Sequence, residues 1–211
     1  MNDLLNNPSD LSLKEKLLFC AINEFAADGY DGASINKIVN KAECSKQLVY
    51  HHFGNKENLF ISVLEYAWNN IRIAEKQVDL SGLSCIEAVN KLIEFTWNYY
   101  LDNLWFLKLV NSENQYKAEH LRKSPRFNEI NQNHLSLMSS IIEQGKKDGI
   151  IRTDIDPIQL NINITALSSY YLINQHTLSL VYKMNLGDQK CLDNRLSVIQ
   201  DLISRWILVT P

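Results

Sequence analysis

Residues 34–60 read SINKIVNKAECSKQLVYHHFGNKENLF, and this stretch carries the clearest structural pattern in the chain. Apolar residues recur at helical spacing from Ile35 to Val39, and Ser45 then stands where the N-cap of a second helix is expected. The pattern predicts two short helices joined by a tight turn, with a third helix beginning at Lys56. Two helices in this arrangement are a common way of placing one of them in the major groove of DNA.

The second predicted helix carries side chains that can read bases. Lys46 can donate to guanine, Gln47 can form two hydrogen bonds with adenine, and Leu48 offers an apolar contact to a thymine methyl group. Lys56 follows at the start of the third helix, where free backbone N–H groups and the helix dipole both favour a phosphate. The predicted DNA-binding residues are Ser34, Ser45, Lys46, Gln47, Leu48, Tyr50, His51, His52 and Lys56.

Other interpretations of these residues remain open. A short amphipathic helix pair with a few lysines can also be a solvated corner of a helical bundle, and for each lysine taken alone this is the commoner case. The run Tyr50-His51-His52 favours a partner surface, because exposed aromatic side chains are costly without one. Zinc binding is not expected, since adjacent histidines on a helix point in different directions and no third ligand stands at metal spacing. We therefore predict no metal or other cofactor.

Residues 13–64 closely resemble the DNA-binding head of TetR-family transcriptional regulators. That head has an amphipathic first helix, a signature of the type FA-x-x-GY, a Thr/Ser-Ile-x-x-Ile helix and a segment of the type SKGTLYYHFxSKExL. The resemblance covers about a quarter of the chain and is highly specific. The matching segments are FAADGY at 25–30, SINKI at 34–38 and SKQLVYHHFGNKENL at 45–59.

Three departures from this pattern fall on the surface that would face bases. Gln47 replaces the usual glycine, Leu48 replaces a small polar residue, and His51 replaces a common aromatic residue. The resemblance implies a ligand-responsive DNA-binding regulator, a repressor that a small molecule releases from a palindromic operator in double-stranded DNA. Because of the three departures, it does not imply a particular operator sequence.

The charge of the chain is distributed unevenly. Its 211 residues carry a formal net charge of −3, whereas residues 34–60 carry +2 and the remainder carries −5. This distribution fits a DNA-facing head on an acidic body and excludes DNA binding by a global positive field. Four scattered cysteines without a CxxC pair predict neither a zinc site nor a disulfide framework, although Cys44, beside the second helix, is a candidate redox-sensing thiol.

The chain reads as a cytoplasmic protein. Residues 1–10, MNDLLNNPSD, lack the basic and apolar regions of a signal peptide. No run of about 18 apolar residues suggests a membrane span, so no membrane contact is expected.

Helical periodicity extends over the chain, which has seven glycines, four prolines and no sustained alternation of apolar and polar residues. We predict an all-α protein of about nine helices, with a three-helix head over residues 1–60 and a larger helical ligand-binding and dimerisation body over residues 61–211. The boundary falls inside a long helix from Lys56 towards Gln77, which joins head and body as a rigid lever. A single helix is expected from Ser124 to Lys147.

The predicted body is rich in aromatic and amide side chains between Phe95 and His120. An aromatic cavity with a few polar groups is the usual form of a small-molecule site, although aromatic residues at helical spacing are more often core. Similar Glu-Asn segments occur in regulators resembling those of nicotinate and pyrimidine degradation, a weak likeness that does not identify the ligand. The predicted effector-binding residues are Trp97, Tyr100, Phe106, Asn111, Asn114 and Tyr171.

The last two predicted helices carry apolar stripes broader than a surface helix needs. One short recognition helix reads too few base pairs for useful specificity, which favours a homodimer. The resemblance implies that these helices pair with their symmetry mates in a four-helix bundle, and burial within one protomer is the alternative. The stripes are Leu160, Ile164, Leu167, Tyr171 and Leu178 on one helix, and Leu196, Ile199, Leu202, Ile203 and Trp206 on the other.

Two other classes of function compete with a regulator. The sequence holds no GxSxG, HExxH, P-loop or GxGxxG motif, and Glu113 with His120, seven residues apart, is a weak basis for acid–base catalysis. We therefore do not expect an enzyme. A helical adaptor that binds protein, or a DNA binder without an inducer, is the remaining alternative.

Overall fold

The computed structural model describes residues 12–209, which form helices and connecting turns without a strand in that range. An isolated bridge between Ile151 and Leu208 is the one extended pairing among these residues. The predicted all-α class is therefore confirmed. Within the same range, no helix is long and apolar enough to cross a bilayer. The expectation that residues 1–10 form no signal peptide concerns a segment outside the described residues.

The chain divides into two compact units. The first holds the described residues up to Lys76 together with Trp105–Gln132, and the second holds Gln77–Leu104 and the described residues from Asn133 onward. The predicted boundary near residue 60 separates a DNA-binding head (1–60) from a ligand-binding and dimerisation body (61–211), and it stays a prediction. It lies inside the first unit, because three later helices pack with the head and the long helix.

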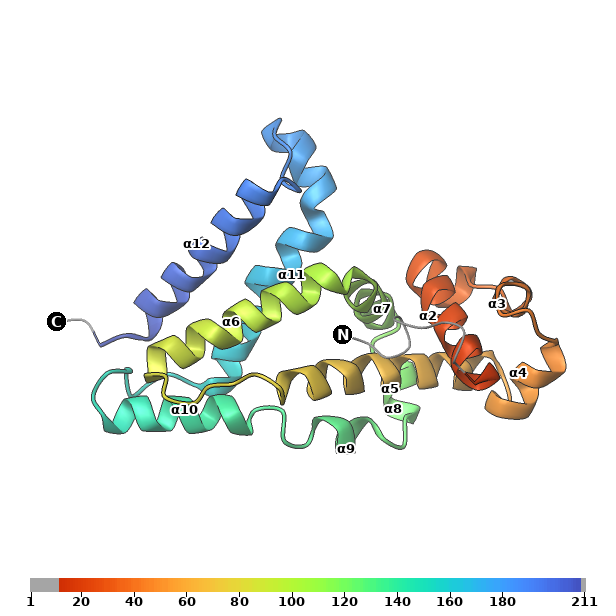
Figure 1. Cartoon of the computed structure of the whole chain (residues 1–211), viewed down its shortest axis with the longest axis horizontal. Coiled ribbons are helices and arrows are strands. Elements are labelled where there is room, and N and C mark those ends of the chain that lie inside the picture. The colour runs from red at the N-terminus through yellow and green to blue at the C-terminus, as the bar shows by residue number, and fades with distance from the viewer. Residues whose placement is uncertain (1–11, 210–211) are drawn as a thin grey trace. The chain divides into compact units, whose positions relative to one another are not determined.

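The first unit begins with four helices: α2 (Leu13–Gly32), α3 (Ile35–Lys41), α4 (Lys46–Phe53) and α5 (Lys56–Glu75) (Figure 1). Ser12 and Glu15 form a capping box at the start of α2, in which each side chain accepts the other residue's backbone N–H. Gly29 breaks α2, with φ 68° and ψ −178°, and one further turn follows it. This backbone region is open almost only to glycine, so the residue fixes the direction of that turn.

Apolar residues at helical spacing form the core of these four helices. Leu17 and Phe25 of α2 are fully buried, as are Val49 of α4 and Phe60 of α5. The Phe25 and Phe60 rings lie 4.7 Å apart between centroids. The short α4, which is too short to be stable alone, is thereby anchored on α5.

Three short helices complete the first unit: α7 (Leu104–Gln115), α8 (Glu119–Lys123) and α9 (Phe127–Asn131). Both α8 and α9 pack on α5. The prediction of one helix from Ser124 to Lys147 is wrong, because the chain leaves helical geometry between Asn131 and Ser136. Asn133 and His134 in this interval have lower helix propensity than the residues beside them, and the segments on either side belong to different units.

The second unit contains α6 (Cys85–Asp102), α10 (Ser136–Lys147), α11 (Pro157–Tyr182) and α12 (Gln189–Ile207). Helix α6 packs against the other three, and α11 and α12 form a hairpin (Figure 1). Asp156 caps the start of α11, and Pro157 occupies its first position. Much of the predicted stripe is buried inside this unit, so the protomer-core alternative holds for Leu160, Ile164, Ile199 and Ile203.

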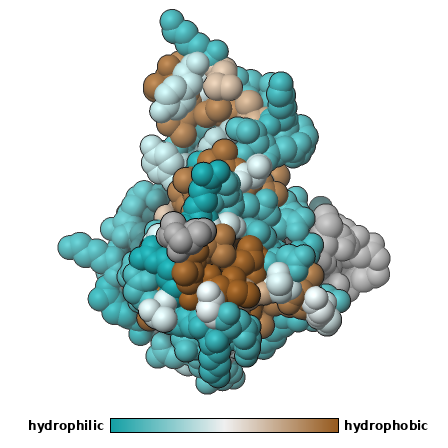
Figure 2. Space-filling view, turned by 90° about the vertical axis from the view of Figure 1, so that its left-hand side faces the viewer, coloured by the Kyte–Doolittle hydropathy of each residue, from teal (hydrophilic) through white to brown (hydrophobic). Residues whose placement is uncertain are grey.

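The hairpin of α11 and α12 also exposes a second apolar face. On α11 this face follows helical spacing from Ile162 through Tyr170 and Ile173 to Leu180, which is 80% exposed. On α12 it includes Leu202, which is 47% exposed. Figure 2 shows apolar side chains (brown) near the tip of the hairpin, at the top of the view.

Candidate nucleic-acid interface

Helix α4 has one buried face and one exposed face. Val49 and Phe53 point into the core, whereas the predicted base- and phosphate-binding side chains lie outside it. Tyr50 is 51% exposed, so its ring and hydroxyl are accessible to a partner. The exposed members of the predicted set on this helix are Lys46, Gln47, Tyr50, His51 and His52, and Leu48 is half-buried.

Ser34 and Ser45 occupy the N-cap positions of α3 and α4 with extended backbones. Neither hydroxyl makes the usual cap hydrogen bond, so the first N–H groups of both helices keep unmet bonding capacity. By contrast, Asn55 does cap α5, and its side chain accepts the Asn58 N–H at 2.7 Å. Two uncapped helix starts with free hydroxyls suit an anion such as a phosphate.

Lys56 is half-buried at the start of α5. Its ammonium nitrogen lies 3.3 Å from the Asp31 carbonyl oxygen and 4.9 Å from the centre of the Tyr30 ring. An ammonium has three donors, so this lysine keeps donors for a phosphate while its position is fixed. It is therefore better ordered than a lysine on a free surface.

Two other lysines of the head are already committed to a buried acid. The Glu24 carboxylate, 2% exposed, lies 3.4 Å from Lys37 and 3.1 Å from Lys41, and it also accepts the Ser34 N–H. Lys37 in addition pairs with Asp28 at 2.8 Å, which lowers the pKa of that carboxyl. The net charge of +2 over residues 34–60 thus overstates the positive charge that is available to bind DNA phosphates. Glu24 was detectable as an acid on the inward stripe of α2.

The turn before α4 holds a strained residue and a protected thiol. Glu43 has φ 52°, in the left-handed region that glycine adopts more easily. Burial raises the pKa of the Cys44 thiol, so the thiol stays protonated at neutral pH. A protonated thiol is a poor nucleophile, which argues against the redox-sensing alternative.

Three of the predicted effector-binding residues lie in the second unit. Trp97 and Tyr100 of α6 are buried, and the Trp97 ring lies 5.8 Å from that of Tyr171 on α11. The Tyr171 hydroxyl donates to the Leu186 carbonyl, and the Arg195 guanidinium lies 5.5 Å from the ring. Burial lowers the pKa of Arg195, and among residues 12–209 no acidic side chain forms an ion pair with it.

The other three belong to the first unit. Phe106 is buried, 5.4 Å from the Trp68 ring, whereas Asn111 and Asn114 are exposed. The Asn114 amide donates to the Val110 carbonyl of its own helix. The six residues are thus split between two units. The buried polar residues of the segment from Phe95 to His120 are Glu113 and His120, which the sequence suggested only as a weak acid–base pair.

Glu113 and His120 do meet, with 2.7 Å between the carboxylate and the imidazole Nδ1. Their side chains are only 2% and 4% exposed, so a substrate has no access to them. Among the described residues, no three His, Cys, Asp or Glu side chains gather as a metal site.

Comparisons with known proteins agree with this geometry. Residues 17–63 match the family described as bacterial regulatory proteins, tetR family, and residues 86–203 match the tetracyclin repressor-like C-terminal domain. The HTH-type transcriptional repressor NicS of Pseudomonas putida is 31% identical over 92% of each chain. A bacterial regulatory protein in the tetR family from Rhodococcus RHA1 superposes with TM-score 0.73 at 17% identity, over 95% of this chain and 100% of that one. The transcriptional regulator FadR of Bacillus subtilis, solved with stearoyl-CoA, gives 0.68 at 17% identity, over 90% and 97%.

Proposed function

The chain belongs to the TetR family of bacterial transcriptional regulators, and from that premise we propose that it is a homodimeric repressor released from a palindromic operator by a small molecule. Members of this family bind operator DNA and small-molecule effectors and act as dimers. One observation carries the proposal for this chain: α4 is anchored by Val49 and Phe53 while its remaining polar and aromatic side chains face outward. The 31% identity to a repressor supports repression as the direction of control.

The proposed DNA contacts separate into two groups. Base contacts come from the exposed first turns of α4, through Lys46, Gln47, Leu48 and His51. Phosphate contacts fix the register of the helix in the groove and carry little sequence information. We assign these to Tyr50 and Lys56, to the uncapped hydroxyls of Ser34 and Ser45, and to His52.

The proposed dimer interface is the exposed apolar face of α11 and α12. Ile162, Tyr170, Ile173 and Leu180 lie on one side of α11, and such a continuous exposed face is characteristic of an interaction site. A dimer supplies two copies of α4, and two such helices read successive major grooves when they lie about 34–36 Å apart. Because operator DNA is in the cytoplasm, the protein is expected to act there.

The proposed effector site lies in the second unit, around Trp97, Tyr100 and Tyr171, three of the residues predicted from the sequence. For Phe106, Asn111 and Asn114, which belong to the first unit, effector binding stays a prediction from the sequence. The guanidinium of Arg195 beside Tyr171 favours an effector with an anionic group, since a part-buried cation gains from a counter-charge. An effector with a differential affinity of about 1–3 kcal/mol for the two states would weaken operator binding about 5–150-fold. The protein is proposed to act by binding and not by catalysis.

The test is selection of duplex DNA from a random library by the purified full-length protein. A palindromic site is expected, and binding should be lost when its half-site spacing is changed by five base pairs, half a helical turn. Recovery of no preferred sequence would support the helical adaptor instead. Once a site is known, a panel of small carboxylates is screened for release of the fluorescently labelled duplex. Calorimetry of any active compound, with and without operator, then measures the coupling from both sides.

A further inference from the structure

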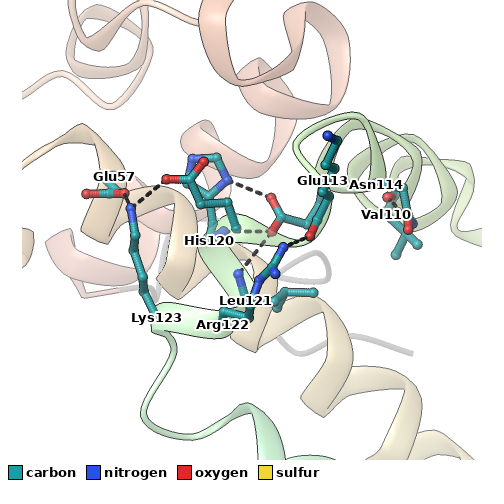
Figure 3. Close-up of polar contacts among 10 residues, drawn as sticks. Glu57, Val110, Glu113, Asn114, His120, Leu121, Arg122 and Lys123 are labelled. Carbon is teal, nitrogen blue, oxygen red and sulfur yellow. Dashed lines mark hydrogen bonds and ion pairs between the residues drawn. The ribbon is translucent and has the colours of Figure 1, made fainter.

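Helix α8 is held on the first unit at both of its ends (Figure 3). At its carboxyl end Lys123 pairs with Glu57 of α5 at 2.6 Å, and the adjoining Ser124 donates to Glu65 of α5 at 2.6 Å. At its amino end the contacts are buried and come from α7. A helix of five residues is too short to be stable alone, so these contacts determine where it lies.

Glu113 of α7 holds the amino end of α8. One carboxylate oxygen accepts the N–H groups of His120 and Leu121 at 2.9 and 3.0 Å, and the other lies 2.7 Å from His120 Nδ1 (Figure 3). The N-cap position is occupied by Ala118, which has no side chain able to cap the helix. Glu113 therefore does two things: it caps α8 and it fixes the orientation of the His120 ring.

The His120 ring lies among aromatic side chains of the DNA-binding helices. Its centroid is 4.4 Å from that of Tyr30, in the last turn of α2, and 4.9 Å from that of Phe60 in α5. Tyr116, in the turn before α8, is 5.3 Å away. The side chain that Glu113 orients thus contacts two helices of the head directly.

Tyr30 is also the ring on which Lys56 rests, with 4.9 Å from the ammonium nitrogen to the ring centre. The same ammonium lies 3.3 Å from the Asp31 carbonyl oxygen, in the residue that follows Tyr30. A continuous series of contacts therefore joins α7 to a lysine that we assign to a phosphate. Every member of the series belongs to one compact unit.

We propose that His120 is a positioning residue for DNA binding: held by Glu113, it fixes the Tyr30 ring and through it the ammonium of Lys56. A movement of α7 that releases His120 removes this support and weakens the operator complex. The inference rests on the proposed function and extends it by naming the residues through which α7 acts on the DNA surface. Neither His120 nor Glu113 contacts DNA in this proposal.

The test is a double-mutant cycle on the selected operator. His120→Gln keeps a polar partner for Glu113 but removes the ring, and we expect it to weaken binding about fivefold or more. In a Lys56→Ala background the same substitution should change affinity by less than about twofold, because the ammonium that His120 positions is already absent. Ser124→Ala is the matched control, since it loosens α8 from α5 without touching the Tyr30 ring. The salt dependence of His120→Gln should fall towards that of Lys56→Ala.

Equal losses in both backgrounds, or an equal loss from Ser124→Ala, would overturn the proposal and leave His120 as a packing residue. If His120→Gln does not fold, as judged by urea unfolding, Glu113→Gln replaces it, because an amide oxygen can still accept both backbone N–H groups. A wild-type protein that selects no DNA would instead overturn the proposed function itself. The two failures are therefore distinguishable.

Discussion

Lys56→Ala should reduce the salt dependence of operator binding without changing which sequence is preferred. The ammonium is fixed between the Asp31 carbonyl and the Tyr30 ring at the start of α5, where a phosphate would be bound. Each phosphate contact contributes about 0.9 to the slope of log K against log salt, so loss of one contact per protomer lowers the slope of a dimer by about 1.8. When salt rises from about 50 to 200 mM, the fold-loss of affinity should therefore be roughly twelve times smaller for the variant than for the wild type.

The assay is fluorescence anisotropy of the labelled operator at four or more salt concentrations. Lys37→Ala is the matched control: it removes the same charge from the same head, but its ammonium pairs with Asp28 and Glu24. Its slope should stay close to that of the wild type. Equal slopes for all three proteins would refute the assignment of Lys56 to a phosphate. An equal fall in both variants would show that the slope reports only the charge of the head.

Three further outcomes are expected. Gln47→Ala should cost about 1–3 kcal/mol at one base pair and relax the preference there, measured by competition with single-base operator variants; uniform weakening would exclude base reading. Ile173→Glu combined with Leu202→Glu should give a monomer by analytical ultracentrifugation, whereas Ile73→Glu, an equally exposed site on α5, should leave the dimer intact. Gly29→Ala should lower the free energy of unfolding by about 1–3 kcal/mol in urea, because alanine strains at this backbone angle; an unchanged midpoint would show that the turn can relax.

The head could be predicted from the sequence because its signals are local. The capping box at Ser12, the turn before Ser45 and the cap at Asn55 each depend on residues three or four positions apart. The apolar spacing then identifies Val49 as core and leaves its neighbours on α4 outside. Local patterns of this kind survive in the fold when no distant contact overrides them.

The parts that could not be predicted depend on contacts between distant residues. Helix α8 has no side-chain N-cap of its own, and Glu113, from the preceding helix, caps it instead. The helix expected from Ser124 onward carries a valid start signal, yet it stops at Asn131 because the next segment packs in another unit. Glu24 neutralises two lysines that a count over a sequence window treats as free. The spacing of aromatic residues likewise could not predict that the six effector-binding candidates are divided between two units.

The neutralisation of these lysines bears on how a released regulator is distributed in the cell. Residues 12–60 carry six lysines and six acidic residues, and two of those lysines bind the buried Glu24. Non-specific adhesion to chromosomal DNA derives almost entirely from counterion release by free cations. A head with so few of them holds the chromosome weakly once its operator contacts are lost. The chromosome would then be a poor reservoir, and most released molecules would diffuse freely between operators.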